Sequence, residues 1–308
     1  MEQHQVNQKS RISHGSEGKT RIGLVLEGGG TRGIYTAGVL DLFMEKGQAF
    51  DGVIGVSAGA IHGASFVSGQ KGRSIRYYKK YCGDRRFMSF WNLITTGDLV
   101  GRDFCYRRLP EELDPYDYDT FNASQTEFYA GCSNLETGKP AYLRVRDMKE
   151  QIDLIRASAS MPYVSRIVDF EGMKLLDGGC TDSIPLEGAR SLGFSRNVVI
   201  LTRHKGYVKK PENASLAGLF YGKYPEFVKA LKNRYRMYND EVERLRQREL
   251  AKEAFVIRPS QELTIGRLER DPEKLQAVYD LGWADGEKAF EKMREWIERV
   301  KEEDPDGR

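Results

Sequence analysis

Short apolar runs alternate with helical patterns along the first two thirds of the chain. The runs 21–27 and 50–56 are almost wholly apolar, which is typical of strands buried on both faces of a parallel sheet. Each run is followed by a glycine-rich turn and then by a helical pattern, which extends to residue 46 in the first case and over 58–69 in the second. This alternation predicts an α/β fold, in which helices cover both faces of a mostly parallel sheet.

Further strands are predicted in the rest of the chain, with a helix over 148–159. Residues 97–122 show no clear periodicity, and we expect them to form a lid or a wall of the active site. The predicted strands are 126–134, 139–145, a hairpin over 167–176, 195–202 and 254–257.

The last third of the chain is charged and helical in pattern, with a predicted break near 282–286. We interpret 211–308 as a mainly helical extension that packs on an α/β catalytic domain over 21–210. Its alternating basic and acidic residues are interpreted as solvated helix faces. Residues 1–20 are polar, without the apolar segment of a signal peptide, and are predicted to be a disordered tail.

Composition and charge limit the classes of function that fit the chain. The 308 residues are 40% hydrophobic and 30% charged, as in ordinary soluble proteins, and the net charge of +3 does not indicate a nucleic-acid partner. No window reaches the roughly 18 apolar residues of a membrane-spanning helix, so contact with lipid would be peripheral. The four cysteines form no Cys-x-x-Cys pair, which suits reduced thiols in the cytoplasm.

Residues 50–63 contain a candidate catalytic serine. Ser57 lies between Gly55 and Gly59 in a Gly-x-Ser-x-Gly pattern, where a buried strand turns sharply into a helix. Side chains at the two glycine positions would collide with neighbouring backbone, which explains the spacing. The pattern is typical of a nucleophile elbow, although alone it is also compatible with a purely structural turn.

A glycine-rich loop connects the first strand to its helix and predicts an anion site, because backbone N–H groups and the helix dipole converge there. Its Gly28-x-Gly30-x-x-Gly33 pattern also fits dinucleotide-binding folds. Those folds need an acidic residue at the end of the second strand, whereas Asp51 lies at its start. No Gly-Lys-Ser/Thr sequence closes a P-loop. We therefore interpret the loop as an oxyanion hole, beside Ser57 at the same sheet edge.

A third motif, Asp177-Gly178-Gly179, ends the predicted hairpin. By itself an Asp-Gly-Gly sequence is typical of a turn. The glycine-rich loop, the Gly-x-Ser-x-Gly pattern and this motif, in that order and each at a predicted strand end, resemble the three signatures of patatin-like phospholipases. Residues 157–162 and 184–185 resemble the same family, and the resemblance spans about 21–202.

The resemblance implies a patatin-like α/β fold and hydrolysis of the acyl esters of phospholipids or lysophospholipids, without a metal or an organic cofactor. Carried over by position, Ser57 would be the nucleophile and Asp177 the base of a catalytic dyad. The N–H groups of Gly29 and Gly30, helped by Arg32, would form the oxyanion hole. The remaining motif positions are glycines: Gly28, Gly33, Gly55, Gly59, Gly178 and Gly179.

Two alternatives stay open. Ser57, Asp177 and His204 follow the chain order of an α/β-hydrolase triad, which would make the protein an esterase or thioesterase. At most two predicted strands precede Ser57, whereas several strands precede the nucleophile in the α/β-hydrolase fold, and this difference argues against the triad. His62 lies about 140° around the helix from Ser57, so we interpret it as structural. The second alternative is a non-catalytic protein that binds acyl lipids.

Basic and aromatic residues gather in 71–91. We expect a solvated helix face and a loop that covers the core. The alternative is peripheral contact with anionic lipid through Lys79, Lys80, Arg85 and Arg86 beside Trp91, because basic residues near such a surface contribute about 1 kcal/mol each. The predicted location is the cytoplasm, with the inner membrane surface as a peripheral site.

Overall fold

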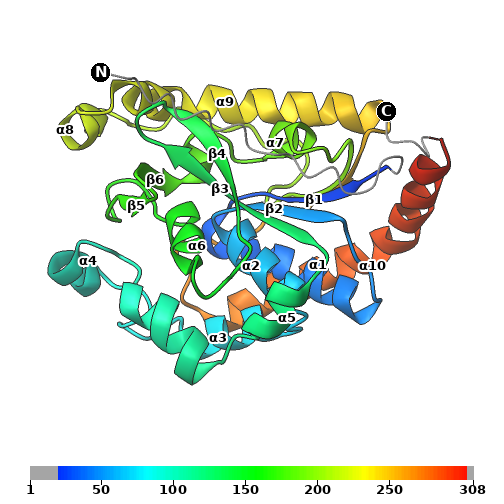
Figure 1. Ribbon diagram of the computed structural model, residues 1–308, viewed down its shortest axis with the longest axis horizontal. Helices are drawn as coiled ribbons and strands as arrows, with labels where there is room; N and C mark the ends of the chain where they lie inside the picture. Colours follow the sequence, from blue (N-terminus) through cyan, green and yellow to red (C-terminus); the bar gives the residue numbers. More distant parts are fainter. Residues whose placement is uncertain (1–19, 304–308) are drawn as a thin grey trace, which may run out of the picture.

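The computed structural model describes residues 20–303, so the predicted tail before Thr20 lies outside the described residues. Within this part of the chain, eight strands form one sheet in the order β5-β6-β3-β2-β1-β7-β8, and β4 pairs with β3 (Figure 1). The strands are β1 (Ile22–Leu26), β2 (Gly52–Val56), β3 (Glu127–Asn134), β4 (Lys139–Arg144), β5 (Val168–Phe170), β6 (Met173–Asp177), β7 (Arg196–Ile200) and β8 (Ala254–Ile257).

The central strands are parallel, as the sequence predicts. β1 pairs in parallel with β2 and β7, β2 with β3, and β7 with β8. The antiparallel pairs lie toward one side of the sheet, where β3 contacts β4 and β6, and β6 contacts β5. Because β1 and β2 are adjacent and parallel, the loops that follow them meet at one sheet edge.

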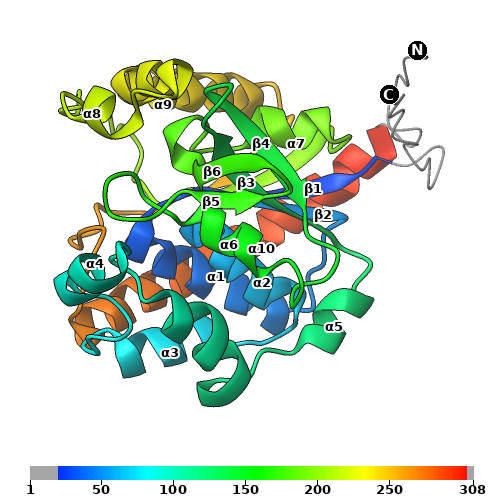
Figure 2. The same ribbon diagram turned by 60° about the vertical axis from the view of Figure 1, so that its left-hand side comes forward.

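Helices cover both faces of the sheet. The α-helices are α1 (Ile34–Glu45), α2 (Ala58–Val67), α3 (Arg73–Tyr81), α4 (Phe90–Thr96), α5 (Tyr118–Ala123), α6 (Ile152–Ser158), α7 (Leu186–Ser191), α8 (Ala217–Tyr221), α9 (Pro225–Leu250) and α10 (Pro272–Glu303). Figures 1 and 2 show α1, α2, α6 and α10 on one face and α7 and α9 on the other. Alternate strand residues supply the two cores: Leu24 and Leu26 face the first layer, and Val25 the second.

The break predicted near 282–286 is wrong, since α10 continues from Pro272 to Glu303. The glycines there serve close packing against α1. A Cβ at Gly282 would lie 2.0 Å from the carbonyl oxygen of Tyr35, and a Cβ at Gly38 would lie 2.1 Å from that of Tyr279. Small residues at the crossing therefore let the two backbones approach each other.

Residues 97–122 fold into a π-helical segment, Phe104–Leu113, followed by α5, and part of this stretch lines a cavity beside Ser57. The predicted domain boundary near residue 210 stays a prediction. β8 lies beyond that position and extends the sheet through its pairing with β7. No helix within residues 20–303 has both the length and the hydrophobicity to cross a bilayer.

Candidate active site

Ser57 occupies a strained turn between β2 and α2, with φ 55° and ψ −120°. A positive φ is costly for a residue with a side chain and is found mainly where the surroundings enforce it. A Cβ at Gly55 would lie 2.5 Å from the amide nitrogen of Ala60, and one at Gly59 would lie 2.5 Å from the carbonyl oxygen of Leu26. The two glycines therefore have the steric role that the sequence predicts.

The structure brings Ser57 and Asp177 together, although they are 120 residues apart. The Ser57 hydroxyl donates a hydrogen bond of 2.8 Å to Oδ2 of Asp177, and the Gly179 N–H donates one of 2.8 Å to Oδ1. Both side chains are buried, and burial raises the pKa of Asp177 above its ordinary value. The positive charge of Arg234 is the largest influence in the opposite direction. The result is a basic carboxylate in contact with the serine.

The backbone of the turn is held by Ser158 at the end of α6. Its Oγ accepts a hydrogen bond of 2.9 Å from the Ser57 N–H and donates one of 2.6 Å to the carbonyl oxygen of Gly131 on β3. Ser158 belongs to the segment 157–162 that resembles the family. Its contacts give this segment a physical role, because they fix the direction in which Ser57 points.

The glycine-rich loop lies beside Ser57 and is tied down at both ends. The Gly28 N–H donates to the carbonyl oxygen of Ser183 (3.2 Å), and the Thr31 N–H donates to that of Arg267 (3.0 Å). Between them, the N–H groups of Gly29 and Gly30 have no protein acceptor among the described residues. These two groups are therefore available to a bound oxyanion.

Two buried contacts shape this loop. Gly30 has φ 58°, and a Cβ there would lie 2.6 Å from the carbonyl oxygen of Arg267, so only glycine fits. Glu27, at the end of β1, accepts hydrogen bonds from the Thr202 N–H and the Tyr238 hydroxyl. The loop is thereby attached to the end of β7 and to α9.

Arg32 points into the site from the same loop. Only 6% of its surface is exposed, and its Nε has no hydrogen-bond partner among the described residues. Burial, followed by the nearby charge of Arg203, lowers the pKa of Arg32 to about 10, so the side chain still carries its charge at neutral pH. An unpaired buried guanidinium favours a negatively charged ligand.

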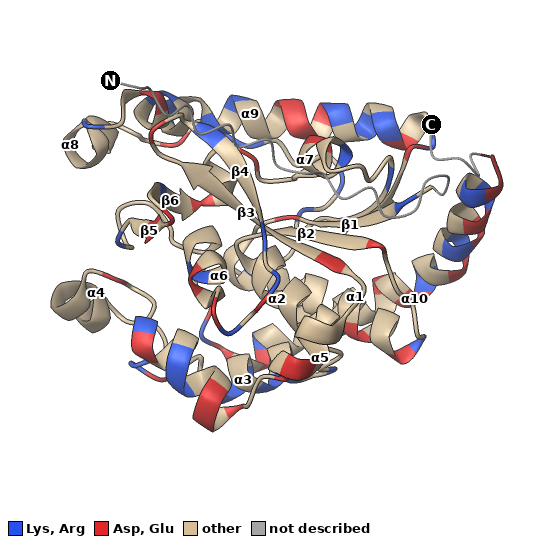
Figure 3. Ribbon diagram, viewed as in Figure 1, with Lys and Arg blue, Asp and Glu red and all other residues tan. Residues whose placement is uncertain are grey.

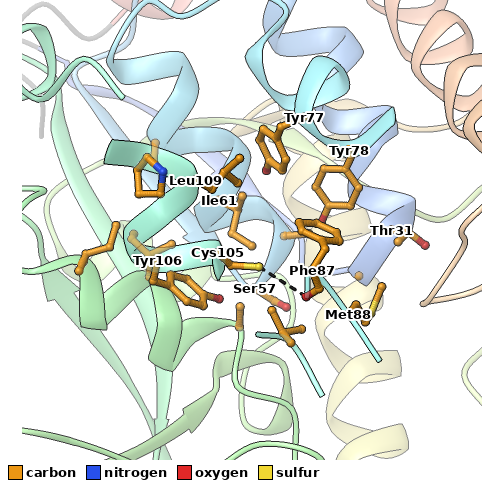
Figure 4. A pocket seen from close by; sticks show the side chains of 18 of the residues that line it. Thr31, Ser57, Ile61, Tyr77, Tyr78, Phe87, Met88, Cys105, Tyr106 and Leu109 are labelled. Carbon is orange, nitrogen blue, oxygen red and sulfur yellow. Dashed lines mark hydrogen bonds between the residues drawn. The ribbon is translucent and has the colours of Figure 1, made fainter. Parts of the chain in front are cut away.

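Two cavities meet at Ser57. The first, of about 140 Å³, is lined mainly by apolar and aromatic side chains from α2, α3 and residues 87–116, and Figure 4 shows them around the serine. The second, of about 360 Å³, contains Gly28, Gly29, Gly30, Arg32, Asp177 and Gly179, with many charged side chains. Gly33 follows in the short 3₁₀ turn Gly30–Gly33, and Gly178 begins another, Gly178–Cys180.

The histidines do not join Ser57 and Asp177. No hydrogen bond links the His204 ring to either residue in the described chain, and His204 lines neither cavity. The ring instead contacts that of Tyr207, at 6.3 Å between centroids. His62 shares a hydrogen bond of 2.9 Å with Ser74 Oγ, and burial lowers its pKa to about 3, which agrees with a neutral structural residue.

The sequence interpretation missed Arg234, which comes from α9. Its Nε donates a hydrogen bond of 2.6 Å to the carbonyl oxygen of Gly179, directly behind Asp177. The sequence interpretation treated the charged residues of this helix as solvated. Arg234 is one of several basic residues in the helix, and nothing in its spacing distinguishes it from the others. No cluster of three or more metal-ligating side chains occurs within residues 20–303.

Comparison with known proteins agrees with this arrangement. The family described as patatin-like phospholipase matches residues 24–190, which is more than half of the chain, and the chain belongs to this family. A second family, a domain of unknown function (DUF6363), matches residues 224–298. The first match contains Ser57, Asp177 and the glycine-rich loop, and the second begins just before α9.

Among curated proteins, the uncharacterized protein YjjU of Escherichia coli is 34% identical over 188 residues, which cover 59% of this chain and 52% of that protein. Lysophospholipase nte1 of Aspergillus terreus is 31% identical over 182 residues, which cover 56% of this chain and 11% of that protein. The chain thus matches about half the length of the first relative and a small part of the second. The crystal structure of VipD from Legionella pneumophila is 13% identical, with a TM-score of 0.43, over 90% of this chain and 68% of that one.

Proposed function

We propose that the protein is a serine hydrolase that cleaves carboxylic esters of lipids, with a phospholipid or lysophospholipid as substrate. The observation that carries this proposal is the hydrogen bond of 2.8 Å from the Ser57 hydroxyl to the buried Asp177 carboxylate. Membership of the patatin-like phospholipase family and the similarity to a fungal lysophospholipase support the substrate class. The apolar cavity beside Ser57 has the lining that an acyl chain requires.

In the proposed reaction, Asp177 accepts the proton of the Ser57 hydroxyl while Oγ attacks the ester carbonyl carbon. The oxyanion that forms is stabilised by the N–H groups of Gly29 and Gly30 and by the charge of Arg32. Asp177 then gives the proton to the departing alkoxide, which leaves an acyl group on Ser57. Water repeats the sequence and releases the fatty acid.

A fluorophosphonate probe tests the nucleophile, because it forms a covalent bond with an activated serine. We expect mass spectrometry to locate the probe on Ser57, and Ser57→Ala to be unlabelled and without ester hydrolysis while folded by circular dichroism. Labelling without turnover of any lipid ester would favour the acyl-binding alternative. Substantial hydrolysis by purified Ser57→Ala would reject the proposal.

We also propose that the enzyme contacts lipid surfaces through α4 and α8, neither of which carries a charged residue (Figure 3). Figures 1 and 2 place the two helices on the same side of the molecule. Their exposed apolar residues are Phe90, Trp91, Ile94, Leu219 and Phe220. Phe90 also lines the charged cavity that contains Ser57, so a bilayer at this surface would lie beside the entrance.

This surface replaces the basic cluster as the proposed contact. Lys79 donates a hydrogen bond of 2.9 Å to Gln276, and Arg86 pairs with Asp84 at 2.7 Å, so both side chains have protein partners. Lys80 and Arg85 lie over the aromatic rings of Tyr81 and Trp91 respectively. The four basic side chains therefore contact neighbouring protein groups, whereas the apolar residues of α4 and α8 are exposed to solvent.

Vesicle co-sedimentation tests the surface. Ile94 and Leu219 are 78% and 80% exposed, and replacing both with serine should weaken binding about ten-fold, since each buries apolar area in lipid. Leu250→Ser is the matched control, because Leu250 is 70% exposed at the opposite end of α9. Equal binding by the double variant and the control would contradict the proposed contact.

A further inference from the structure

The second cavity at Ser57 contains an unusual concentration of charge. It is lined by five basic side chains and three carboxyl groups. The basic residues are Arg32, Arg203, Lys209, Arg234 and Arg267, and the carboxyl groups belong to Glu27, Asp177 and Glu212.

The carboxyl groups do not neutralise all of this positive charge. Glu212 alone is shared by three cations, at 2.8 Å from Lys209, 3.3 Å from Arg234 and 2.9 Å from Arg267. Hydrogen bonding to Lys209 and the charge of Arg234 lower its pKa to about 2, against the effect of burial. Burial raises the pKa of Glu27, which is bound to the backbone and to a tyrosine. The Glu212 carboxylate is thus the salt-bridge partner of three basic residues.

Arg32 and Arg203 have no salt bridge to a carboxylate within residues 20–303. Arg203 lies over the ring of Tyr207, at 4.1 Å from the centroid, and this ring fixes its guanidinium without neutralising it. Arg32 is buried with an unpaired Nε. The charge of Glu27 acts on Arg32 from beyond salt-bridge distance. Both guanidinium groups therefore face the cavity without a direct carboxylate partner among the described residues, and an added anion can pair with both.

Most of these cations come from outside the part of the chain that matches the patatin-like family. That match ends at residue 190, whereas Arg203, Lys209, Arg234 and Arg267 follow it. Arg234 and Arg267 lie in the matched domain of unknown function. The C-terminal part of the chain thus adds a charged wall to a serine site supplied by the N-terminal part.

We propose that this wall is an anion-binding subsite, which holds a phosphate group while the ester carbonyl lies at Ser57 and the acyl chain in the apolar cavity. This inference rests on the proposed hydrolase function and adds to it the residues that would bind the phosphate group on the alcohol side of the ester, most of which lie beyond the match to the patatin-like family. Guanidinium groups bind phosphate oxygens in pairs, which suits Arg32 and Arg203.

Two esters with the same palmitoyl chain test the subsite: a monoacylglycerol phosphate and the neutral monoacylglycerol. The quantity measured is the ratio of their kcat/KM values. We expect the wild type to favour the phosphate-bearing ester, and Arg203→Met to reduce the ratio about ten-fold, mainly through KM, because a charged hydrogen bond is lost. Arg203→Lys should recover part of the ratio. Lys205→Met, which removes an exposed charge two residues away, should not change it.

The other outcomes are equally informative. A ratio that Arg203→Met leaves unchanged would overturn the subsite, even if both esters are cleaved. If neither ester is cleaved, binding of the phosphate ester to Ser57→Ala and to Ser57→Ala with Arg203→Met still tests the subsite separately from the hydrolase proposal. Inorganic phosphate, added during hydrolysis of the neutral ester, distinguishes the source. Inhibition that Arg203→Met removes, without preference between the esters, would assign the subsite to free phosphate.

Discussion

The two cavities that share Ser57 differ in both chemistry and origin. The apolar one is lined mainly by residues 57–161, from α2, α3, α6 and the π-helical segment, all within the match to the patatin-like family. The charged one is completed by residues 203–268, after that match ends. Ser57 therefore faces one wall from residues that match the patatin-like family and another from residues beyond that match.

This contrast indicates how the site divides its tasks. Apolar walls exclude water and suit an acyl chain. Asp177 lines the charged cavity, where its own burial raises its pKa and makes the carboxylate more basic. Charged walls orient a bound substrate, because an anionic group can bind them in only a few orientations. The rate of reaction at Ser57 should then depend on both cavities. Selectivity for the length of the acyl chain should depend on the apolar cavity, and selectivity for the headgroup on the charged one.

The largest effect is expected where the cavities meet. Asp177→Asn keeps an oxygen for the Gly179 N–H but removes the carboxylate that we propose as the base, and we expect roughly a thousand-fold loss in kcat. His204→Ala should stay within about two-fold of the wild type, because within residues 20–303 its ring has no hydrogen bond to Ser57 or Asp177 and lines neither cavity. Steady-state kinetics on a short, uncharged ester compares both. Similar losses in the two folded variants would favour a triad.

A smaller effect should separate the apolar cavity from the charged one. Ala64 lies on α2 two turns beyond Ser57 and lines the apolar cavity. Ala64→Leu should occupy space that the acyl chain needs and reduce kcat/KM for a palmitoyl ester about ten-fold, which corresponds to about 1.4 kcal/mol in activation free energy. A butyryl ester on the same protein is the control and should be little affected. Equal losses for both chain lengths would mean that the acyl chain lies elsewhere.

The sequence predicts those parts of the site whose local backbone needs particular residues. The turn at Ser57 requires Gly55 and Gly59 for steric reasons, and Gly30 has the positive φ that a glycine-rich loop suggests. Each of these requirements can be recognised from the few residues that make up the motif. The central strands are predicted equally well, because strands buried on both faces are continuously apolar.

The missed features depend on a partner that is distant in sequence. Gly282 looks like a helix breaker unless the closeness of Tyr35 is known. Arg234 and Arg203 look like solvated charges, since nothing local distinguishes a cation that faces a cavity from one that faces water. Glycine substitutions are poor tests of the proposed oxyanion hole for the same reason: a Cβ at Gly29 would lie 2.7 Å from Thr202 Oγ1.

The smallest expected effect concerns how α9 is held on the charged side of Ser57. Glu241 accepts hydrogen bonds from the Ser183 N–H and lies buried beside Asp182, so burial and then the Asp182 charge raise its pKa well above the ordinary value. Glu241 therefore holds its proton to a higher pH in the folded protein than in the unfolded chain, where a glutamate has a pKa near 4.3. Stability conferred by this group is complete below the unfolded pKa and declines as the pH rises toward the folded one. Glu241→Gln needs no proton, so relative to the wild type it should gain about 1.4 kcal/mol per pH unit within that window. Thermal unfolding at pH 5 and pH 8 measures the difference, and parallel changes in the two proteins would show that Glu241 is ionised in the fold.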